Sequence, residues 1–329
     1  MSKSRLIFAL LVFAPALAPM PAAAENACEI APQPRDHVSP ASDVGDYRSV
    51  LRLCSRAEGS RRVALREMRV GGQTGLLLAD PETLATELQA ATCWTCRDVD
   101  ESALASTRLM RAVDASAEAP GLAKRGFLEN AGLTHGDGDG AFLTGDLCPS
   151  VKPMDRAFID ALGTQGSHTP IALSISGLWL THHYRDYLWL LDKQASGAID
   201  ILWTNHSYHH PFKRGVAFDR NFLLTPGVDA DAEILDTERL LIANGQTPSL
   251  FFRFPGLISN APLMQAARRH HLISLGADAW LALRQRPMPG SIVLVHPNGN
   301  EPAGLKIYAR EQAEGVLPKP LRALNEAPP

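Results

Sequence analysis

The chain has 329 residues and a formal net charge of −3, with 45% hydrophobic and 20% charged residues. This mildly acidic balance gives no reason to expect nucleic acid as a partner. The length suffices for one barrel-sized domain and a smaller region.

The N-terminus has the layout of a secretory signal peptide. Lys3 and Arg5 precede an apolar stretch over residues 6–13, and small residues follow up to Ala24. This order predicts that residues 1–24 are a signal peptide cleaved near Ala24. A transmembrane anchor is the alternative, but the apolar run is far shorter than the roughly 20 residues that a bilayer requires. We therefore expect an exported protein, periplasmic or secreted, without a membrane span.

Five cysteines follow the predicted cleavage site, which indicates disulfides in an oxidising compartment. They are Cys28, Cys54, Cys93, Cys96 and Cys148. We predict the pairs Cys28–Cys54 and Cys93–Cys96, although spacing alone leaves the connectivity open, and an odd count leaves at least one thiol unpaired. The Cys93–Cys96 spacing matches thiol redox proteins, but no thioredoxin-like strand precedes it. Zinc binding by this pair would require a second pair.

Residues 25–134 form an N-terminal extension of unknown role, in which we recognise no functional motif. Apolar and polar residues alternate over 62–78 around a Gly-Gly pair, which predicts a β-hairpin. Residues 81–91 have helical spacing. We expect this region to pack against the main domain as a cap or support.

Strands and helices are predicted to alternate over residues 135–329. The glycine-rich start at 135–140 is typical of a linker, because a calcium loop would need a later glutamate that is absent. Apolar runs predict strands at 141–146, 171–176, 199–203, 249–252 and 291–295. Helical periodicity predicts helices at 154–162, 184–194, 231–243 and 261–271. The alternation indicates a parallel sheet that is closed or nearly closed into a barrel.

A histidine cluster follows the predicted strand at 199–203. His206 and His210 are four residues apart, so on a helix both rings would lie on one face, close enough to bind one metal ion. His209 would point elsewhere. A histidine-rich surface loop is the alternative. The position at the C-terminal end of a strand, where α/β enzymes place their chemistry, favours the metal site.

Four further short motifs surround this cluster. They are Leu143-Thr144-Gly145-Asp146, Phe252-Arg253-Phe254-Pro255-Gly256, Asp278-Ala279-Trp280 and Ile292-Val293-Leu294-Val295-His296. Together with the histidine pair, their order and content resemble the polysaccharide deacetylases of carbohydrate esterase family 4, which carry the NodB-homology domain. The resemblance covers roughly residues 135–325 and implies an α/β fold, a distorted (β/α) barrel of seven strands with the small N-terminal extension beside it.

The resemblance implies catalytic roles for four residues. Asp146 matches the aspartate that takes a proton from water, and Arg253 matches the arginine that pairs with this aspartate. His296 matches the general acid, and Asp278 would hold the imidazolium of His296 in orientation. Each residue lies at or just beyond the end of a predicted strand, so all can converge on one mouth of the barrel.

The resemblance also implies a metal site and an acyl pocket. His206 and His210 would bind a divalent metal, with zinc expected, that activates water and polarises the acyl carbonyl. Trp280 and Leu294 match residues that line the small apolar pocket for the acetyl methyl group. Ordinary core packing explains these two residues nearly as well.

Two positions depart from the family pattern. Leu147 stands where the family has a second aspartate, the third protein ligand of the metal. Either the two histidines hold the metal with Asp146 drawn in as a ligand, or the site is weak, or metal binding is lost. In addition, residues 253–256 are one residue shorter than the family's motif, which has an extra residue between proline and glycine. This shortening puts in doubt the backbone N–H with which family members stabilise the oxyanion of the reaction. Cys148 can face the site, but we expect a disulfide or a buried thiol.

The expected function is metal-dependent hydrolytic removal of N-acetyl groups from an acetylated polysaccharide or oligosaccharide of the envelope or the extracellular space. Peptidoglycan, chitin-like oligomers and exopolysaccharides are the substrates that the resemblance implies, and hydrolysis of another small amide or ester is a further alternative. A catalytically silent barrel that binds a glycan or a partner is the main alternative, motivated by Leu147. The presence of Asp146, Arg253, Asp278 and His296 favours hydrolysis.

Overall fold

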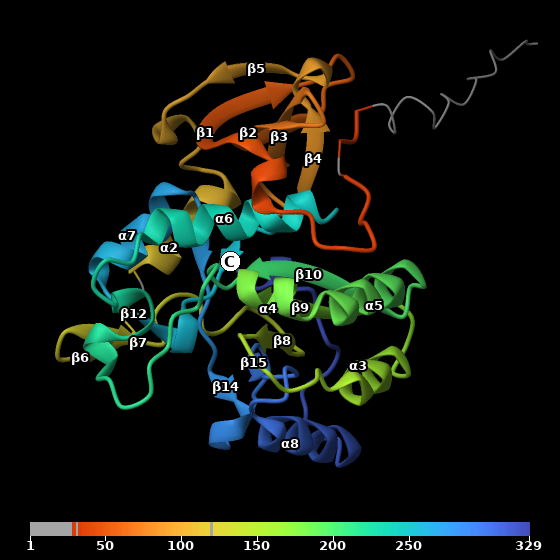
Figure 1. The fold of residues 1–329 in the computed structure, drawn as a ribbon, viewed down its shortest axis with the longest axis vertical. Coiled ribbons are helices and arrows are strands. Elements are labelled where there is room, and N and C mark those ends of the chain that lie inside the picture. Colours follow the sequence, from red (N-terminus) through yellow and green to blue (C-terminus); the bar gives the residue numbers. More distant parts are fainter. Residues whose placement is uncertain (1–27, 31, 119–120) are drawn as a thin grey trace, which may run out of the picture.

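The computed structural model describes residues 28–30, 32–118 and 121–329. Two sheets dominate it: a five-stranded antiparallel sheet from the N-terminal part of the chain, and a seven-stranded parallel sheet flanked by helices (Figure 1). The predicted signal peptide lies outside the described residues. Within the described ranges, no helix has the length and apolarity needed to cross a bilayer.

The N-terminal sheet has the strand order β4-β3-β2-β1-β5. Its strands are β1 (Gly45–Ser55), β2 (Arg61–Val70), β3 (Gln73–Ala79), β4 (Thr86–Ala90) and β5 (Thr95–Asp98). The predicted hairpin over 62–78 is confirmed, because β2 and β3 pair antiparallel across Gly71 and Gly72. These two residues have φ angles of 56° and 82°, a backbone region that glycine adopts at little cost.

The predicted helix over 81–91 is wrong. Asp80 accepts hydrogen bonds from the backbone amides of Glu82 and Thr83, which closes a turn after β3. The chain then returns as β4 and pairs antiparallel with β3, burying Leu88. Leu88, one of the apolar residues that suggested a helical face, is buried by strand pairing instead, and this tertiary context outweighs the local spacing.

Both predicted disulfide pairings are wrong. The bonds join Cys28 to Cys93 and Cys54 to Cys96. Cys54 and Cys96 lie directly opposite each other on the antiparallel strands β1 and β5. The carbonyl oxygen of Cys28 accepts a hydrogen bond from Ala90, which brings Cys28 beside the segment that leads to Cys93. Strand register therefore determines the pairing, and Cys93 and Cys96 do not form a redox pair with each other.

The seven-stranded sheet confirms the predicted α/β fold, a distorted barrel of seven strands. Its strands are β8 (Phe142–Leu147), β9 (Thr169–Ile175), β10 (Ile199–Asn205), β11 (Phe251–Phe252), β13 (Ile273–Ser274), β14 (Ala279–Trp280) and β15 (Ile292–Val295). All neighbours are parallel in the order β13-β11-β10-β9-β8-β15-β14. The end strands β13 and β14 are joined along the chain by residues 275–278 alone, so this short segment spans the opening of the barrel.

Helices flank the parallel sheet (Figure 1). They are α3 (Arg156–Gly163), α4 (Gly177–His182), α5 (Tyr184–Ala195), α6 (Ala230–Ala243), α7 (Ala261–Arg269) and α8 (Pro302–Ala313), and α2 (Arg108–Glu118) precedes the barrel. A small sheet combines β6 (Leu122–Lys124), β7 (Phe127–Glu129) and β12 (Ile258–Ser259). The four predicted helices after residue 150 all occur, with ends shifted by a few residues. Asp155, Asp229 and Asn260 cap α3, α6 and α7 by accepting backbone N–H bonds.

Helix α6 lies between the N-terminal sheet and the barrel (Figure 1). Ile242 and Ala243 at its end pack with Met68 and Leu77 of the N-terminal sheet. Ile234, nearer its start, packs in a cluster with Phe252 of β11. The helix therefore presents apolar side chains to both parts of the chain, and the N-terminal sheet shares a hydrophobic interface with the barrel.

A buried ion pair crosses this interface. Arg66 of β2 donates from Nε to Glu238 Oε2 at 2.8 Å and from Nη2 to Oε1 at 3.1 Å. The hydroxyl of Tyr47 also donates to Glu238 Oε2, at 2.8 Å. The side chains of Arg66 and Glu238 are 1% and 0% exposed. Such a pair is costly to break, because removal of one partner leaves the other charge buried without compensation.

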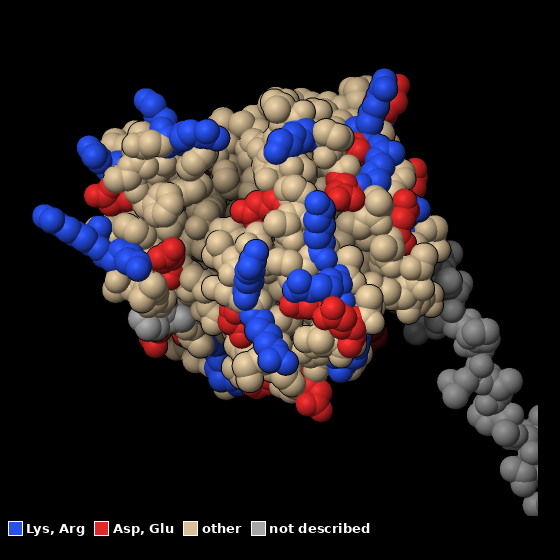
Figure 2. Space-filling model, turned by 90° about the horizontal axis from the view of Figure 1, so that it is seen from below, with Lys and Arg blue, Asp and Glu red and all other residues tan. Residues whose placement is uncertain are grey.

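The exposed surface carries charges of both signs. On the face seen in Figure 2, Lys and Arg side chains are interspersed with Asp and Glu rather than gathered over one element. Several of them form ion pairs, such as that between Arg322 and Glu326. Because solvent screens such pairs, they contribute little to stability.

We expect Glu238→Ala to lower the free energy of unfolding by about 3–5 kcal/mol, the usual cost of leaving a buried partner charge unpaired. Urea unfolding with both disulfides intact measures this loss. Glu326→Ala is the matched control, because it removes the same carboxylate from an exposed pair. Equal stability of the two variants would show that the Arg66–Glu238 pair does not stabilise the interface.

Candidate active site

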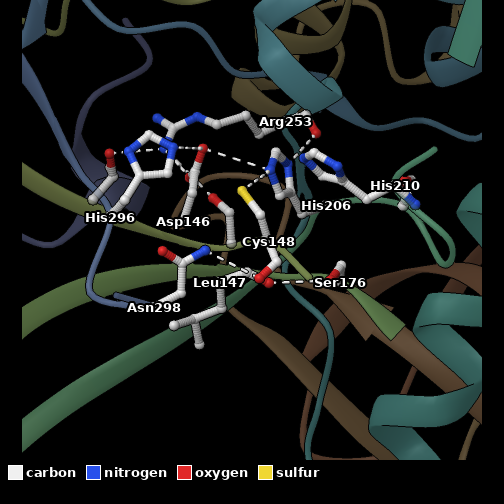
Figure 3. A network of polar contacts seen from close by, with 12 residues as sticks. Asp146, Leu147, Cys148, Ser176, His206, His210, Arg253, His296 and Asn298 are labelled. Atoms are coloured by element: carbon white, nitrogen blue, oxygen red, sulfur yellow. Dashed lines mark hydrogen bonds and ion pairs between the residues drawn. The ribbon is translucent and has the colours of Figure 1, made fainter. Parts of the chain in front are cut away.

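Four motif residues meet at the C-terminal ends of the parallel strands. Asp146 lies at the end of β8, His206 directly follows β10, Arg253 follows β11 and His296 follows β15. Their side chains come together in one network (Figure 3), beside a cleft of about 820 Å³. The strand-end positions predicted that these four residues would meet, whereas Asp278, which was predicted to join them, does not contact His296.

Asp146 is held as a carboxylate by its buried neighbours. Arg253 Nη1 donates to Asp146 Oδ1 at 2.7 Å and to Thr144 Oγ1 at 2.9 Å. Burial alone would raise the pKa of Asp146, but the charge of Arg253, followed by those of His206 and His296, lowers it to about 2. The other oxygen, Oδ2, lies 3.6 Å from His206 Nε2 and 3.9 Å from His296 Nε2. Asp146 is thus ionised and directed at both imidazoles.

The histidine pair lies on a turn, not on a helix, the geometry for which the sequence places both rings on one face. Ser207 and His210 have φ angles of 64° and 47°, which a right-handed helix does not contain. Asn205 Oδ1 accepts from the Ser207 amide, and Ser207 Oγ accepts from the His210 amide, so side-chain bonds shape the turn. The rings of His206 and His210 still lie together, with centroids 4.7 Å apart. The expected pairing of the two rings holds without a helix.

Both imidazoles offer a ring nitrogen to a ligand. His206 Nδ1 lies 2.8 Å from the carbonyl oxygen of Arg253, which can only accept, so Nδ1 carries the proton and Nε2 keeps its electron pair. Nε2 of His210 is buried and lacks a hydrogen-bond partner among the described residues. Burial lowers the pKa of His206, and burial followed by the neighbouring His206 lowers the pKa of His210 to about 3. Neutral imidazoles of this kind are the form that binds metal ions.

Cys148 joins the histidine pair from the loop after β8. Its Sγ lies 3.5 Å from His206 Nε2, and the ligand atoms of Cys148, His206 and His210 all lie within 4.8 Å of one another. The ligand atoms of Asp146, Cys148 and His296 also lie within 4.8 Å of one another. Cys148 is outside both disulfides, and burial raises the pKa of its thiol well above the ordinary range. The structure therefore places a half-buried thiol inside the site, at the lining of the cleft.

His209 lies outside the group of metal-binding atoms, although it is among the residues that line the cleft. Its side chain is 63% exposed, and its Nδ1 lies 2.7 Å from Glu233 Oε1 at the start of α6. This contact belongs to the surface beside the cleft.

Glu301, not Asp278, contacts His296. His296 Nδ1 lies 2.9 Å from Glu301 Oε2, and the same oxygen accepts a hydrogen bond from Trp280 Nε1 at 2.9 Å. Asp278 instead accepts from the first amide of β15 at 3.0 Å and lies 2.6 Å from His135 Nδ1. The predicted contact of Asp278 is wrong, because its carboxylate ties the start of β15 to the segment before β8. Glu301 reaches back to His296 from the start of α8.

The two predicted pocket residues have different places. Trp280 lines the cleft, and its ring centroid lies 5.5 Å from that of His296. Leu294 is fully buried in a hydrophobic cluster and is not among the residues that line the cleft. The prediction for Leu294 is therefore corrected, and core packing accounts for this residue.

Leu147 belongs to the hydrophobic core. Side chains alternate along β8, so Asp146 faces the site, Leu147 faces the opposite side and Cys148 faces the site again. Leu147 is fully buried among apolar side chains, and Figure 3 shows it directed away from the histidines. Position 147, where the family pattern has an aspartate, therefore contributes an apolar side chain to the core. The side chain that faces the histidines from this part of the chain is the thiol of Cys148.

We expect Leu147→Asp to destabilise the protein by more than about 4 kcal/mol without strengthening metal binding, because the new carboxylate enters the core unpaired. Leu147→Met is the control, since a volume-conserving apolar exchange costs less than about 1.5 kcal/mol. Urea unfolding and metal titration measure the two effects. A folded Leu147→Asp variant with tighter metal binding would show that the end of β8 can turn this side chain into the site.

Comparison with known proteins gives low but consistent similarities. No family model matches the chain. The chain is similar to a family 4 carbohydrate esterase from Bacillus anthracis, at 19% sequence identity, covering 60% of this chain and 87% of that one, with a TM-score of 0.44. It is similar to the family 4 carbohydrate esterase PdaA from Bacillus subtilis, at 16% identity, covering 70% and 90% of the two chains, with a TM-score of 0.44. It is also similar to a CE4 family pseudoenzyme from Bacillus anthracis, at 15% identity, covering 59% and 67%, with a TM-score of 0.41. Similarities of this size carry no argument about activity, which rests on the residues of the chain itself.

Proposed function

We propose that the chain is a hydrolase that removes N-acetyl or similar small acyl groups from an acetylated polysaccharide or oligosaccharide. Hydrolysis of an amide requires one group that takes a proton from water and another that gives a proton to the leaving nitrogen. The observation that carries the proposal is the juxtaposition of two such groups: Asp146 Oδ2 lies 3.9 Å from Nε2 of His296, which lines the cleft. This separation lets both groups act on one substrate bond.

The residues divide the proton transfers between them. Asp146 accepts a proton from the attacking water, whose oxygen bonds to the acyl carbon, while Arg253 keeps Asp146 ionised through the contact at 2.7 Å. His296 donates a proton to the sugar nitrogen as the carbon–nitrogen bond breaks, so that acetate and a free amine leave. Glu301 orients the imidazole through Nδ1.

His206 and His210 would hold a divalent metal ion in this site, with zinc expected. The fit rests on their free ring nitrogens, above all the buried Nε2 of His210 that lacks a partner among the described residues. Such an ion acidifies a bound water and polarises the acyl carbonyl. A carboxylate with a pKa of about 2 is a weak base, so the acidification that the ion would supply suits Asp146 as the proton acceptor.

The lining of the cleft suits a sugar polymer. Phe212, Phe222 and Trp280 contribute aromatic side chains, and Phe212 is 59% exposed. Lys152 and Arg214 contribute cations to the same lining. Aromatic faces pack against the apolar faces of sugar rings, while polar groups fix the orientation of the ligand. With the predicted export, this lining supports an envelope or extracellular glycan as substrate.

A catalytically silent barrel that binds a glycan or a partner is the second candidate. It is favoured by Leu147, which puts an apolar side chain where the family pattern has a metal-binding carboxylate. Under this hypothesis, the aromatic side chains of the cleft still bind glycan, but no acyl group is released.

Acetate release by the purified mature protein tests the two candidates. The substrates are chitin oligomers, peptidoglycan fragments and an O-acetylated glycan, each incubated with the zinc-loaded protein, with the chelated protein and with the chelated protein after zinc is restored. We expect zinc-dependent release from an N-acetylated substrate. Glycan binding without acyl release from any member of the panel would favour the silent barrel.

We expect Glu301→Gln to lower the kcat of acetate release by about 10- to 100-fold, the range typical of losing a carboxylate that orients a functional histidine. Glutamine keeps the size of the side chain but removes the charge that faces His296. Asp278→Asn is the matched control, because Asp278 contacts His135 instead, and its kcat should stay within a few-fold of the parent value. The reverse order of the two effects would restore the assignment of Asp278 that the family resemblance implies.

A further inference from the structure

We propose that Cys148, His206 and His210 together form a Cys-His-His metal site in which the Cys148 thiolate takes the place of the carboxylate missing at position 147. In this arrangement, Asp146 stays outside the coordination sphere and remains available to accept a proton. The inference deepens the proposed function, since it concerns the metal of the same site.

The separation of the sulfur atom and one nitrogen matches a tetrahedral ion. On a zinc ion with bonds of about 2.0 Å to nitrogen and about 2.3 Å to sulfur, tetrahedral angles place sulfur and nitrogen roughly 3.5 Å apart. Cys148 Sγ and His206 Nε2 lie 3.5 Å apart. All three ligand atoms lie within 4.8 Å of one another, so only small side-chain rotations are needed to bind one ion.

The unpartnered nitrogen of His210 is an independent observation that points to a ligand. Nε2 of His210 is buried and has no hydrogen-bond partner among the described residues. A buried polar atom without a partner costs stability. His210 offers a ring nitrogen within 4.8 Å of the ligand atoms of Cys148 and His206, so a cation bound there would be within reach of this imidazole.

The backbone around Cys148 is fixed by polar contacts that come from other elements. Asn298 Nδ2 donates to the Cys148 carbonyl at 3.0 Å (Figure 3). Two residues on, His183 Nε2 lies 2.8 Å from the Ser150 carbonyl, and Ser150 Oγ donates to Asn300 Oδ1 at 3.1 Å. A ligand held on such a supported segment is preorganised for binding, as built metal sites require.

A thiolate ligand changes which metal the site selects. Thiolate with two imidazoles favours zinc and disfavours magnesium, calcium and manganese, which bind oxygen donors. The thiol releases its proton to solvent when the metal–sulfur bond forms. Three protein ligands leave one position open, as hydrolytic zinc sites require.

Cobalt substitution tests the proposal on the full mature chain. We expect the Co²⁺-loaded parent to show a sulfur-to-cobalt charge-transfer band in the near ultraviolet and a one-to-one metal stoichiometry. Cys148→Ser should lose the band and bind zinc at least about 10²-fold more weakly, because even indirect ligand changes cost 10- to 100-fold. Asp146→Asn should keep both the band and the stoichiometry.

A second variant distinguishes loss of the sulfur ligand from loss of the fold. Cys148→Asp supplies a carboxylate at the same position, so it should bind metal without the charge-transfer band. A parent without the band, or an Asp146→Asn variant that loses its metal while Cys148→Ser keeps it, would overturn the proposal. Because neither readout depends on turnover, a protein that shows the band but releases no acetate would contradict the proposed function alone.

Discussion

Replacing Asp146 by asparagine is expected to lower the kcat of acetate release by about 10²–10⁴-fold, the range for losing a positioned proton acceptor. Asparagine keeps the shape of the side chain and can still accept a hydrogen bond from Arg253, which now contacts Asp146 Oδ1 at 2.7 Å. It cannot take a proton from water. Initial rates on an N-acetylated oligosaccharide, at saturating substrate and with zinc present, measure the loss.

The interpretation of this variant depends on its fold and its metal. Asp146→Asn leaves the buried Arg253 without a counter-charge, so circular dichroism and metal content must be measured on the same sample. A folded, metal-loaded variant with low kcat assigns the proton transfer to Asp146. Turnover equal to that of the parent in such a sample would remove Asp146 from the mechanism.

The double variant His206→Ala/His210→Ala is expected to bind no stoichiometric metal and to release no acetate. The two rings supply two of the three ligand atoms that lie within 4.8 Å of one another, and a lone thiol binds zinc too weakly to replace them. Metal analysis after gel filtration measures the loss directly.

His209→Ala is the matched control for this variant, because it removes a neighbouring imidazole that is 63% exposed and paired with Glu233. It should keep full metal content. If the double variant retained its metal, the site would lie elsewhere in the chain, and the roles of Cys148, His206 and His210 would be wrong together.

Much of the site could be predicted because its residues occupy strand ends. Asp146, His206 and His296 each follow a short apolar run, and parallel strands bring their C-terminal ends to one edge of the sheet. Arg253 was predictable as a buried partner for the same reason. Sequence order and strand position are enough to place such residues together, even where β11 is only two residues long.

The partner of His296 could not be predicted from spacing. Asp278 and Glu301 are both acidic residues near this histidine in the chain, and the choice depends on how the loop after β15 folds. That loop brings Glu301 to 2.9 Å from His296 Nδ1, while Asp278 is held by the β15 backbone. Only the tertiary path of the chain distinguishes them.

The third potential ligand was predicted only in part, because the sequence allowed Cys148 to face the site but favoured a disulfide or a buried thiol. Leu147 draws attention because it breaks the family pattern, but strand alternation sends it into the core and turns Cys148 toward the histidines. In the N-terminal part, strand register paired Cys54 with Cys96, which spacing could not foresee. In both cases the direction of side chains across strands decided the outcome.

The most direct test of the central claim, that water cleaves an acyl bond at this site, is to run the reaction in water enriched in heavy oxygen and to analyse the released acetate by mass spectrometry. The zinc-loaded protein acting on an N-acetylated oligosaccharide should yield acetate that carries a single heavy oxygen, together with a glycan that carries the corresponding free amine. Acetate without heavy oxygen, or an oligosaccharide that stays fully acetylated while the protein holds its metal, would contradict the account.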